Sequence, residues 1–352
     1  MVKYETKHDE VVKMSEILNE LFELAMRGLT GEIYDEPISD ETHMYQLIHE
    51  HGLAAMCFEA IDKDLVSPEF YNKLKKTTDA FILRDAQQTE LFKALIGIFI
   101  VAEVPHIFLK GMFLKSLYPK RYMRGMGDID ILIKTEDLEY VHHHFLSHDM
   151  KCVSKSYAQY VYITKEGLTI ELHPRLLSHD KRVILEDPFK ANYLARGYTY
   201  VLPYTEELIY LFSHLKKHVL HSGIGFTSLI DIGYYVMRFE RSIDVKRFHQ
   251  LLDEYQLTEF YRKIMMLNHI YFDFNYIKPS FDYDALEEDK FAQLSDYLAR
   301  SGTHGLGKDF FLNEVKVARY QLEGKGKIQM FFDMVFPPYH EIKWMYPKLL
   351  FI

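Results

Sequence analysis

The sequence predicts an α+β protein in which a small mixed-sheet domain is flanked by N-terminal and C-terminal helical regions. Near the N-terminus, apolar residues recur at helical spacing, at Val12, Ile17, Leu18, Leu21 and Phe22. In the middle of the chain the period changes to two, as in Leu168–His173, which is the spacing of a strand. Helical spacing returns from Thr205 onward. We therefore expect a helical region at 1–104, a mixed α/β domain at 105–203 and a helical domain at 204–352.

The same patterns predict the individual elements. In the first region, Asp40 is a candidate N-cap for a helix over Met44–His51, and a long helix is expected from Pro68 to about Val101. In the middle domain we expect strands at His106–Leu109, Asp128–Ile133, Tyr157–Thr164 and Leu168–His173, with helices at Gly111–Tyr118 and Glu136–Ser147. In the last region we expect helices at Glu206–His221, Thr227–Phe239, Val245–Tyr255, Glu259–Tyr271 and Asp284–Arg300, then an irregular tail at Pro337, Pro338 and Pro347.

The composition narrows the class of partner. Of the 352 residues, 48% are hydrophobic and 26% are charged, which is ordinary for a folded globular protein. The formal net charge of −9 gives no positive field that could hold an extended nucleic-acid duplex. A local basic stretch, Lys115–Arg124, leaves a short nucleic-acid end open as a partner.

The chain shows no signal for targeting, membrane insertion or disulfide bonding. The segment Met1–Glu10 is charged, and the longest apolar run, Ala94–Ala102, is far shorter than the ~18 residues that a membrane span needs. Cys57 and Cys152 lie in apolar contexts without CxxC spacing, so we expect two reduced, buried thiols. These features predict a cytoplasmic protein with no membrane partner.

Asp128 and Asp130 are candidate metal ligands. Residues two apart in a strand point to the same face, so the two carboxylates project together from the segment DIDILI. Ile129, Ile131 and Ile133 project from the other face into a core. Two carboxylates this close raise each other's pKa, and a cation between them removes that cost.

A second alternating segment repeats this arrangement. Thr169, Glu171 and His173 share one face of the expected strand at Leu168–His173. If the two strands are neighbours with their polar faces aligned, Asp128, Asp130 and Glu171 form one acidic cluster. Oxygen ligands of this kind suit Mg²⁺ or Mn²⁺ rather than zinc. Two such ions about 4 Å apart can hold a triphosphate, activate an attacking oxygen and stabilise a leaving pyrophosphate.

A glycine follows a lysine at the expected turn between the first strand and its helix. Lys110 and Gly111 stand where exposed backbone N–H groups and a helix N-terminus attract phosphate. Between Gly111 and Asp128 there is room for a short helix and a loop.

These residues carry a resemblance to a known family. The stretch FLKGMFLKSLYPKRYMRGMGDIDILI resembles the KG…LY…R…GDxDxL signature of the uncharacterised nucleotidyltransferase family within the DNA-polymerase-beta-like superfamily. The positions on this pattern are Lys110, Gly111, Tyr118, Arg124, Gly127, Asp128, Asp130 and Leu132. The segment IELH, ending at His173, resembles the family's strand with the third carboxylate. The segment SHLKKHVLHSGIGFTSLIDIG resembles its histidine-bearing helical stretch with a downstream aspartate, Asp231. The resemblance extends over roughly Phe108 to Met237.

The resemblance implies that 105–203 is a nucleotidyltransferase catalytic domain that takes an NTP and two Mg²⁺ or Mn²⁺ ions. Its implied catalytic metal ligands are Asp128, Asp130 and Glu171, and its implied nucleotide- and phosphate-binding residues are Lys110, Gly111, Arg124 and Gly127. The chain departs from the wider superfamily at the phosphate-binding turn, which is usually Gly-Gly or Gly-Ser. Here Met112 follows a single glycine, so the phosphate grip is expected to rely on the Lys110 charge and the helix amides.

Arg124 has two open roles. Its rigid fork could contact a triphosphate, or it could hold the acidic loop that leads to Asp128. A surface ion pair is the plain structural alternative.

The helix expected at Glu206–His221 carries two stripes. One is apolar and is formed by Leu208, Leu211, Phe212, Leu215 and Val219. The other is formed by His214, Lys217, His218 and His221, and it either faces a cleft or is a solvated helix face. Asp231 lies among apolar neighbours and needs a partner, for which His214 or His218 is the candidate. His173 could orient Glu171 or bind substrate.

Three functions remain open on these residues. The first is an enzyme that transfers a nucleoside monophosphate from an NTP to a hydroxyl of a small molecule, a protein or an RNA end. The second is a catalytically weak or inactive nucleotide-binding regulatory protein with the same fold. The third is a helical adaptor, which requires Asp128, Asp130 and Glu171 to lie apart in space.

Overall fold

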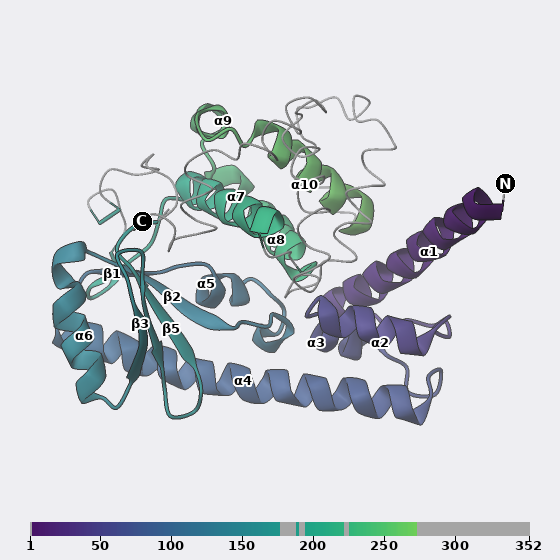
Figure 1. Ribbon diagram of the computed structural model, residues 1–352, viewed down its shortest axis with the longest axis horizontal. Coiled ribbons are helices and arrows are strands. Elements are labelled where there is room, and N and C mark those ends of the chain that lie inside the picture. The colour runs from purple at the N-terminus through teal and green to yellow at the C-terminus, as the bar shows by residue number, and fades with distance from the viewer. Residues whose placement is uncertain (1, 177–187, 190–193, 222–224, 273–352) are drawn as a thin grey trace, which may run out of the picture.

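The computed structural model describes residues 2–176, 188–189, 194–221 and 225–272 (Figure 1). Within these residues, helices at both ends of the chain surround a mixed sheet, as predicted. The expected helix at Asp284–Arg300 and the proline-containing tail lie outside the described residues.

The N-terminal region is helical. It comprises α1 (Val2–Thr30), α2 (Glu41–Glu50), α3 (Ala54–Ala60) and α4 (Pro68–Val101). The predicted N-cap is confirmed, because the Asp40 side chain accepts a hydrogen bond from the backbone N–H of His43. Ser67 caps α4 in the same way, with Pro68 in its first turn, and this long helix has the bounds that the sequence predicts.

Seven strands of the described chain form one sheet in the order β3-β4-β5-β2-β1-β7-β6. Their bounds are β1 (His106–Phe108), β2 (Asp128–Ile133), β3 (Lys151–Lys155), β4 (Tyr160–Ile163), β5 (Thr169–His173), β6 (Leu194–Arg196) and β7 (Thr199–Tyr200). The central pair, β2 and β5, is parallel, whereas β1 and β4 run antiparallel to these neighbours. The short elements between the strands are α5 (Gly111–Lys115), η1 (Arg121–Met123), η2 (Thr135–Asp137) and α6 (Leu138–Ser147).

One face of the central strands is buried against α4 and α6. The alternating residues of β2 and β5 that were expected to point into a core are at most 2% exposed, and they pack with Leu95, Phe99, Val141 and Phe145. In Figure 1 the long helix α4 runs beside the sheet, with α6 next to it. This packing leaves the polar residues of β2 and β5 on the opposite face.

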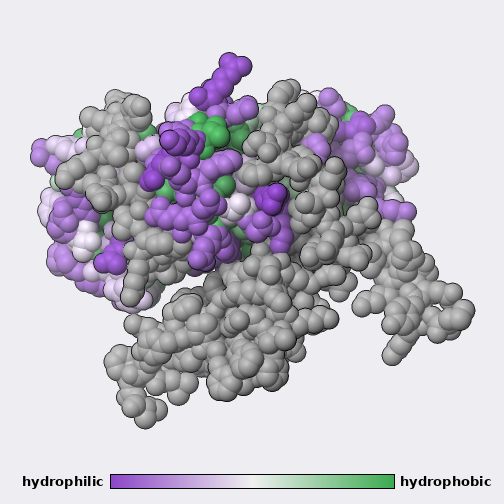
Figure 2. Space-filling view, turned by 90° about the horizontal axis from the view of Figure 1, so that it is seen from above, coloured by the Kyte–Doolittle hydropathy of each residue, from purple (hydrophilic) through white to green (hydrophobic). Residues whose placement is uncertain are grey.

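The C-terminal helices pack with the N-terminal ones. They are α7 (Tyr204–His221), α8 (Thr227–Phe239), η3 (Glu240–Ser242), α9 (Val245–Glu254) and α10 (Thr258–Phe272). Phe22 of α1 contacts Phe226 at 4.6 Å and Phe272 at 4.9 Å between ring centroids, within one shared hydrophobic core. Seen from above, the described surface is mainly hydrophilic, with smaller apolar patches (Figure 2). No helix among the described residues is long and apolar enough to cross a bilayer.

Several elements differ from the expectation. Helix α5 ends at Lys115 rather than Tyr118, and Pro119 disfavours helical backbone at Tyr118 itself. Strand β3 was not predicted, since its segment KCVSK is an exposed edge without an apolar alternation. The strand expected at 157–164 is confined to Tyr160–Ile163. Of the two thiols predicted to be buried, Cys57 is buried but Cys152 is only half-buried.

Candidate active site

The site begins with the pairing of two strands. Because β2 and β5 are parallel neighbours, Asp130 lies directly opposite Glu171, and Asp128 lies opposite Thr169. The period of two places these residues and His173 on one face of the sheet. The adaptor hypothesis requires the acids to lie apart, and this condition is not met for Asp130 and Glu171.

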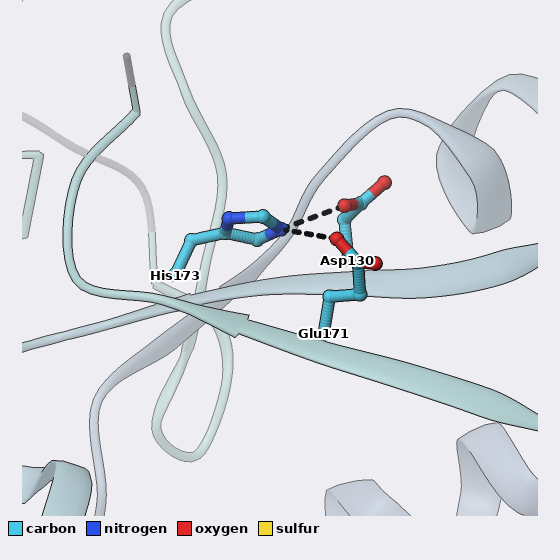
Figure 3. Close-up of side chains that lie close together, drawn as sticks. All are labelled: Asp130, Glu171 and His173. Carbon is cyan, nitrogen blue, oxygen red and sulfur yellow. Dashed lines mark hydrogen bonds and ion pairs between the residues drawn. The ribbon is translucent and has the colours of Figure 1, made fainter. Parts of the chain in front are cut away.

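Three side chains from these strands converge. One ligand atom each of Asp130, Glu171 and His173 lies within 4.8 Å of the other two, and the three side chains point toward one another in Figure 3. The His173 Nε2 atom is 2.7 Å from Asp130 Oδ1 and 3.5 Å from Glu171 Oε2. The sequence predicted Asp128 in the cluster. The structure groups His173 with Asp130 and Glu171, and it places Asp128 in the wall of the same cleft, where its charge interacts with those of Asp130 and Glu171.

The three carboxyl groups differ in how strongly their surroundings favour ionisation. Burial, followed by the charge of Asp130, raises the pKa of both Asp128 and Glu171. Burial acts in the same direction on Asp130, but the Lys110 ammonium and the hydrogen bond from His173 outweigh it and hold that pKa well below its usual range. Asp130 is therefore a firmly ionised carboxylate beside two acids whose ionisation is disfavoured.

Lys110 links the strands to the C-terminal helices. Its Nζ lies 3.1 Å from Asp130 Oδ2 and 2.6 Å from His214 Nε2. Burial and the nearby ammonium lower the pKa of His214 well below its usual value, so the neutral imidazole accepts from the lysine. Lys110 caps α5 with a backbone φ of 47°, a conformation that is strained for a residue with a side chain.

Helix α7 forms the opposite wall. His214, Lys217 and His218 all line the cleft, as one of the two alternatives for this stripe predicted. The Nε2 atoms of His214 and His218 lie 3.1 Å apart, and burial lowers the pKa of Lys217. The side chain of His221, the fourth member of the predicted stripe, lies outside what the structure describes.

The cleft between these walls has a volume of about 520 Å³. This volume lies within the range that accommodates a small molecule or cofactor. Its wall combines the acids of β2 and β5 with Lys110, which directly precedes α5, and with Lys217 of α7, and it also includes Asp231 of α8. An anionic ligand bridged to the acids by divalent cations fits such a two-sided arrangement.

A sequence model of a family described as uncharacterised nucleotidyltransferase matches residues 38–273. The chain belongs to this family. The match spans all the residues of the cleft and confirms the resemblance that the GDxDxL pattern indicated. No curated protein and no solved structure matches the chain.

In this nucleotidyltransferase family member, Asp231 has other partners than the sequence suggested. Arg124 donates to Asp231 from Nε and Nη2, both at 2.8 Å, and the Tyr118 hydroxyl donates to Oδ1 at 2.8 Å. The prediction of His214 or His218 as the partner is wrong, because Asp231 meets the loop before β2, whereas His214 meets Lys110. The guanidinium is committed to Asp231, so the geometry favours the loop-holding role of Arg124 over phosphate contact.

The two glycines of the predicted phosphate-binding set differ. A Cβ on Gly111 would lie 2.1 Å from Met126 Sδ, so the missing side chain lets the loop before β2 pack onto the turn. A Cβ on Gly127 would meet nothing within 4 Å. Of the two, Gly111 is the position where a side chain would require a neighbour, the Met126 side chain, to move.

Sequence reasoning missed two contributors. Gln88 of α4 donates to the backbone carbonyl of Met126 at 2.7 Å, and the buried Lys115 donates to the Gln88 Oε1 at 2.8 Å. Tyr210 is buried in the cleft wall, with Lys110 Nζ 5.6 Å from its ring centroid. Tyr210 stands four residues before His214, so the stripe on α7 carried a signal for it. No local pattern indicated Gln88.

Proposed function

We propose that the protein is a metal-dependent nucleotidyltransferase that moves a nucleoside monophosphate from an NTP to an acceptor hydroxyl. The observation that carries this proposal is the register of β2 against β5, which sets Asp130 opposite Glu171 on the face that carries Asp128. Membership of the nucleotidyltransferase family supports the class of chemistry and an NTP as the donor.

The residues of the site fit divalent cations. The raised pKa values of Asp128 and Glu171 come from burial and from mutual repulsion with Asp130, and both are relieved by a bound cation. Asp128, Asp130 and Glu171 are the proposed metal ligands, and Mg²⁺ or Mn²⁺ suits them. When bound, two such ions would neutralise these acids and supply electrophilic activation for the acceptor oxygen and the pyrophosphate leaving group.

The remaining residues have roles that need only their own charges. Lys110 presents an ammonium beside Asp130, where it can contact the triphosphate as the nucleotide enters. Lys217 faces the same cleft from α7 and adds a second cation. His214 accepts a hydrogen bond from the Lys110 ammonium, which limits the directions in which that side chain can point. Arg124 and Gly127 belong to the loop that brings Asp128 to the cleft.

The acceptor is proposed only as a class. The proposed acceptor is a hydroxyl of a small molecule, of a protein side chain or of an RNA end. The acidic net charge of −9 argues against an extended nucleic-acid duplex.

Two measurements test the proposal. Isothermal titration with Mg²⁺ and each of the four NTPs is expected to show binding of at least one nucleotide by the full chain. The double variant Asp128→Asn with Asp130→Asn should lose this metal-dependent binding, whereas Glu166→Gln, an exposed acid on the β4–β5 turn, should keep it. The proposal is wrong if the double variant binds nucleotide as strongly as the wild type, or if the wild type binds no nucleotide.

A regulatory protein that binds nucleotide but turns over little or none is the second candidate. Its support is the departure at the phosphate-binding turn, where α5 is only five residues long and carries a single glycine. Incubation of the protein and a lysate with NTP labelled at the α-phosphate separates the two. Label transfer with pyrophosphate release supports the enzyme, and saturable binding without pyrophosphate release supports the regulator.

A further inference from the structure

His173 closes the metal-binding face of the site with a nitrogen atom. We infer that His173 is a direct ligand of a cation held by Asp130 and Glu171, so that the site prefers Mn²⁺ to Mg²⁺. This inference rests on the proposed metal-dependent transfer and adds to it a ligand and a choice of ion.

The spacing of the three atoms carries the inference. Ligand atoms on neighbouring positions of a six-coordinate ion with bonds of about 2.1 Å lie about 3 Å apart, and atoms on opposite positions lie about 4 Å apart. His173 Nε2 is 2.7 Å from Asp130 Oδ1 and 3.5 Å from Glu171 Oε2, and all three atoms lie within 4.8 Å. Small side-chain adjustments place them around one ion.

The backbone fixes this grouping. Glu171 and His173 are two residues apart on β5, so they share a face, and Asp130 is paired directly with Glu171. Figure 3 shows the imidazole turned toward both carboxylates. Asp128 is two register positions away, opposite Thr169, whereas the ligand atoms that lie within 4.8 Å of one another belong to Asp130, Glu171 and His173.

The contacts of Asp130 also support a cation shared with His173. Its Oδ2 is turned to the Lys110 ammonium at 3.1 Å, and its Oδ1 is turned to His173. Oδ1, the oxygen that faces the imidazole, is therefore the one available to a cation shared with His173. In the neutral tautomer with its proton on Nδ1, His173 offers the Nε2 lone pair, and the cation takes the place of the hydrogen that lies between Nε2 and Oδ1.

The choice of ion follows from the donor set. Mg²⁺ is a hard ion that favours oxygen ligands and retains its waters, whereas first-row transition ions accept imidazole readily. Mn²⁺ accepts both carboxylate oxygen and imidazole nitrogen. Two carboxylates and one imidazole therefore favour Mn²⁺ relative to a site made of oxygen alone.

Pulsed electron paramagnetic resonance of bound Mn²⁺ tests the ligand directly. The full chain, prepared without a histidine tag, is titrated with Mn²⁺ alone and with Mn²⁺ plus inorganic tripolyphosphate, which contains no nitrogen. The wild type is expected to show ¹⁴N modulation from one imidazole, which becomes ¹⁵N modulation after labelling with ¹⁵N-histidine. His173→Gln should lose the modulation and bind Mn²⁺ about tenfold or more weakly, with a smaller change for Mg²⁺.

The matched control is His214→Gln. This imidazole lines the same cleft but contacts Lys110, so its removal should leave the ¹⁴N modulation in place. Mn²⁺ bound to the wild type without nitrogen modulation overturns the inference and leaves the proposed function standing. No Mn²⁺ binding, with or without tripolyphosphate, overturns the metal-dependent function itself. If His173→Gln fails to fold, the isotope-labelled wild type and His214→Gln still decide between these outcomes.

Discussion

Arg124 and Asp231 form a two-armed ion pair, with Nε–Oδ1 and Nη2–Oδ2 distances of 2.8 Å each. The pair joins the loop before β2 to helix α8, across 107 positions of the sequence. The side chain of Arg124 is 13% exposed and that of Asp231 is 8% exposed, so water solvates neither charge well. The loop that ends at Asp128 is therefore held by the C-terminal helices.

Removing one partner of this pair should be strongly destabilising. Asp231→Ala leaves the Arg124 charge buried without its carboxylate, and we expect a loss of about 3–5 kcal/mol in the free energy of unfolding. Chemical denaturation of the variant measures the loss. Asp79→Ala breaks the exposed pair with Lys75, and as the control it should cost only about 0.5 kcal/mol or less. Similar losses in the two variants would contradict the burial argument.

Glu207 should make stability depend on pH. Burial raises the pKa of this α7 carboxyl to about 8, from an ordinary value of 4.5. The folded chain therefore binds a proton that the unfolded chain releases, and the stabilisation is fully present below about pH 4.5 and is lost as pH rises through about 8. Glu207→Gln cannot ionise, so its stability relative to wild type should rise across this window, by on the order of 1.4 kcal/mol for each pH unit at most. Unfolding measured from pH 5 to 9 tests this, and parallel curves would refute it.

Glu171 should trade stability against cation binding. It stands directly opposite Asp130, and like charges in that position are unfavourable by about 0.2–1 kcal/mol. Glu171→Gln should therefore raise the melting temperature in the presence of a chelator. The same variant should lose most of the stabilisation that Mn²⁺ gives the wild type, because ligand binding to the folded state stabilises it by mass action. A variant that is less stable in chelator and gains as much from Mn²⁺ as the wild type would contradict both statements.

The sequence predicts the elements that have a long or clean period. Helix α4 and strand β2 have the predicted bounds because each carries many turns or alternations of one pattern. Strand β3 escapes prediction because an exposed edge has no apolar face to reveal, and β7 is only two residues long. The period of apolar residues indicates which face of an element is buried, so a prediction based on it misses elements with little burial.

Some features of the candidate site can likewise be predicted from the sequence, and others cannot. The shared face of Asp130 and Glu171 follows from the period of two in each strand, once the strands are neighbours. The partner of Asp231 does not follow from any local pattern, because it depends on how α8 packs against a loop far away in the chain. The grouping of His173 with the acids required the register between the strands.

Lys110 should contribute more to the binding of a nucleoside triphosphate than to the binding of a nucleoside monophosphate. Its ammonium lies in the cleft beside Asp130, so Lys110→Met should weaken binding of an NTP by about tenfold, or about 1.4 kcal/mol, and weaken a nucleoside monophosphate much less. The variant Lys217→Met allows the same comparison for the ammonium on the opposite wall of the cleft. Titration calorimetry with both nucleotides measures the effect. Equal losses for the monophosphate and the triphosphate would show that Lys110 does not contact the outer phosphates.

Gln88 should position the loop before β2 without touching a ligand. Its amide donates to the carbonyl of Met126, two residues before Asp128, while the buried Lys115 fixes the other end of that amide. Gln88→Leu releases the carbonyl, and a loop displaced by about 1 Å can reduce kcat by about a hundredfold while KM changes little. Thr89→Ala is the matched control, because Thr89 lies next on α4 and bonds Arg121 rather than the loop. Steady-state kinetics with the accepted NTP should separate the two variants, and Mn²⁺ binding should weaken only in Gln88→Leu. If both variants lose kcat equally, the effect belongs to α4 as a whole and not to the hydrogen bond on Met126.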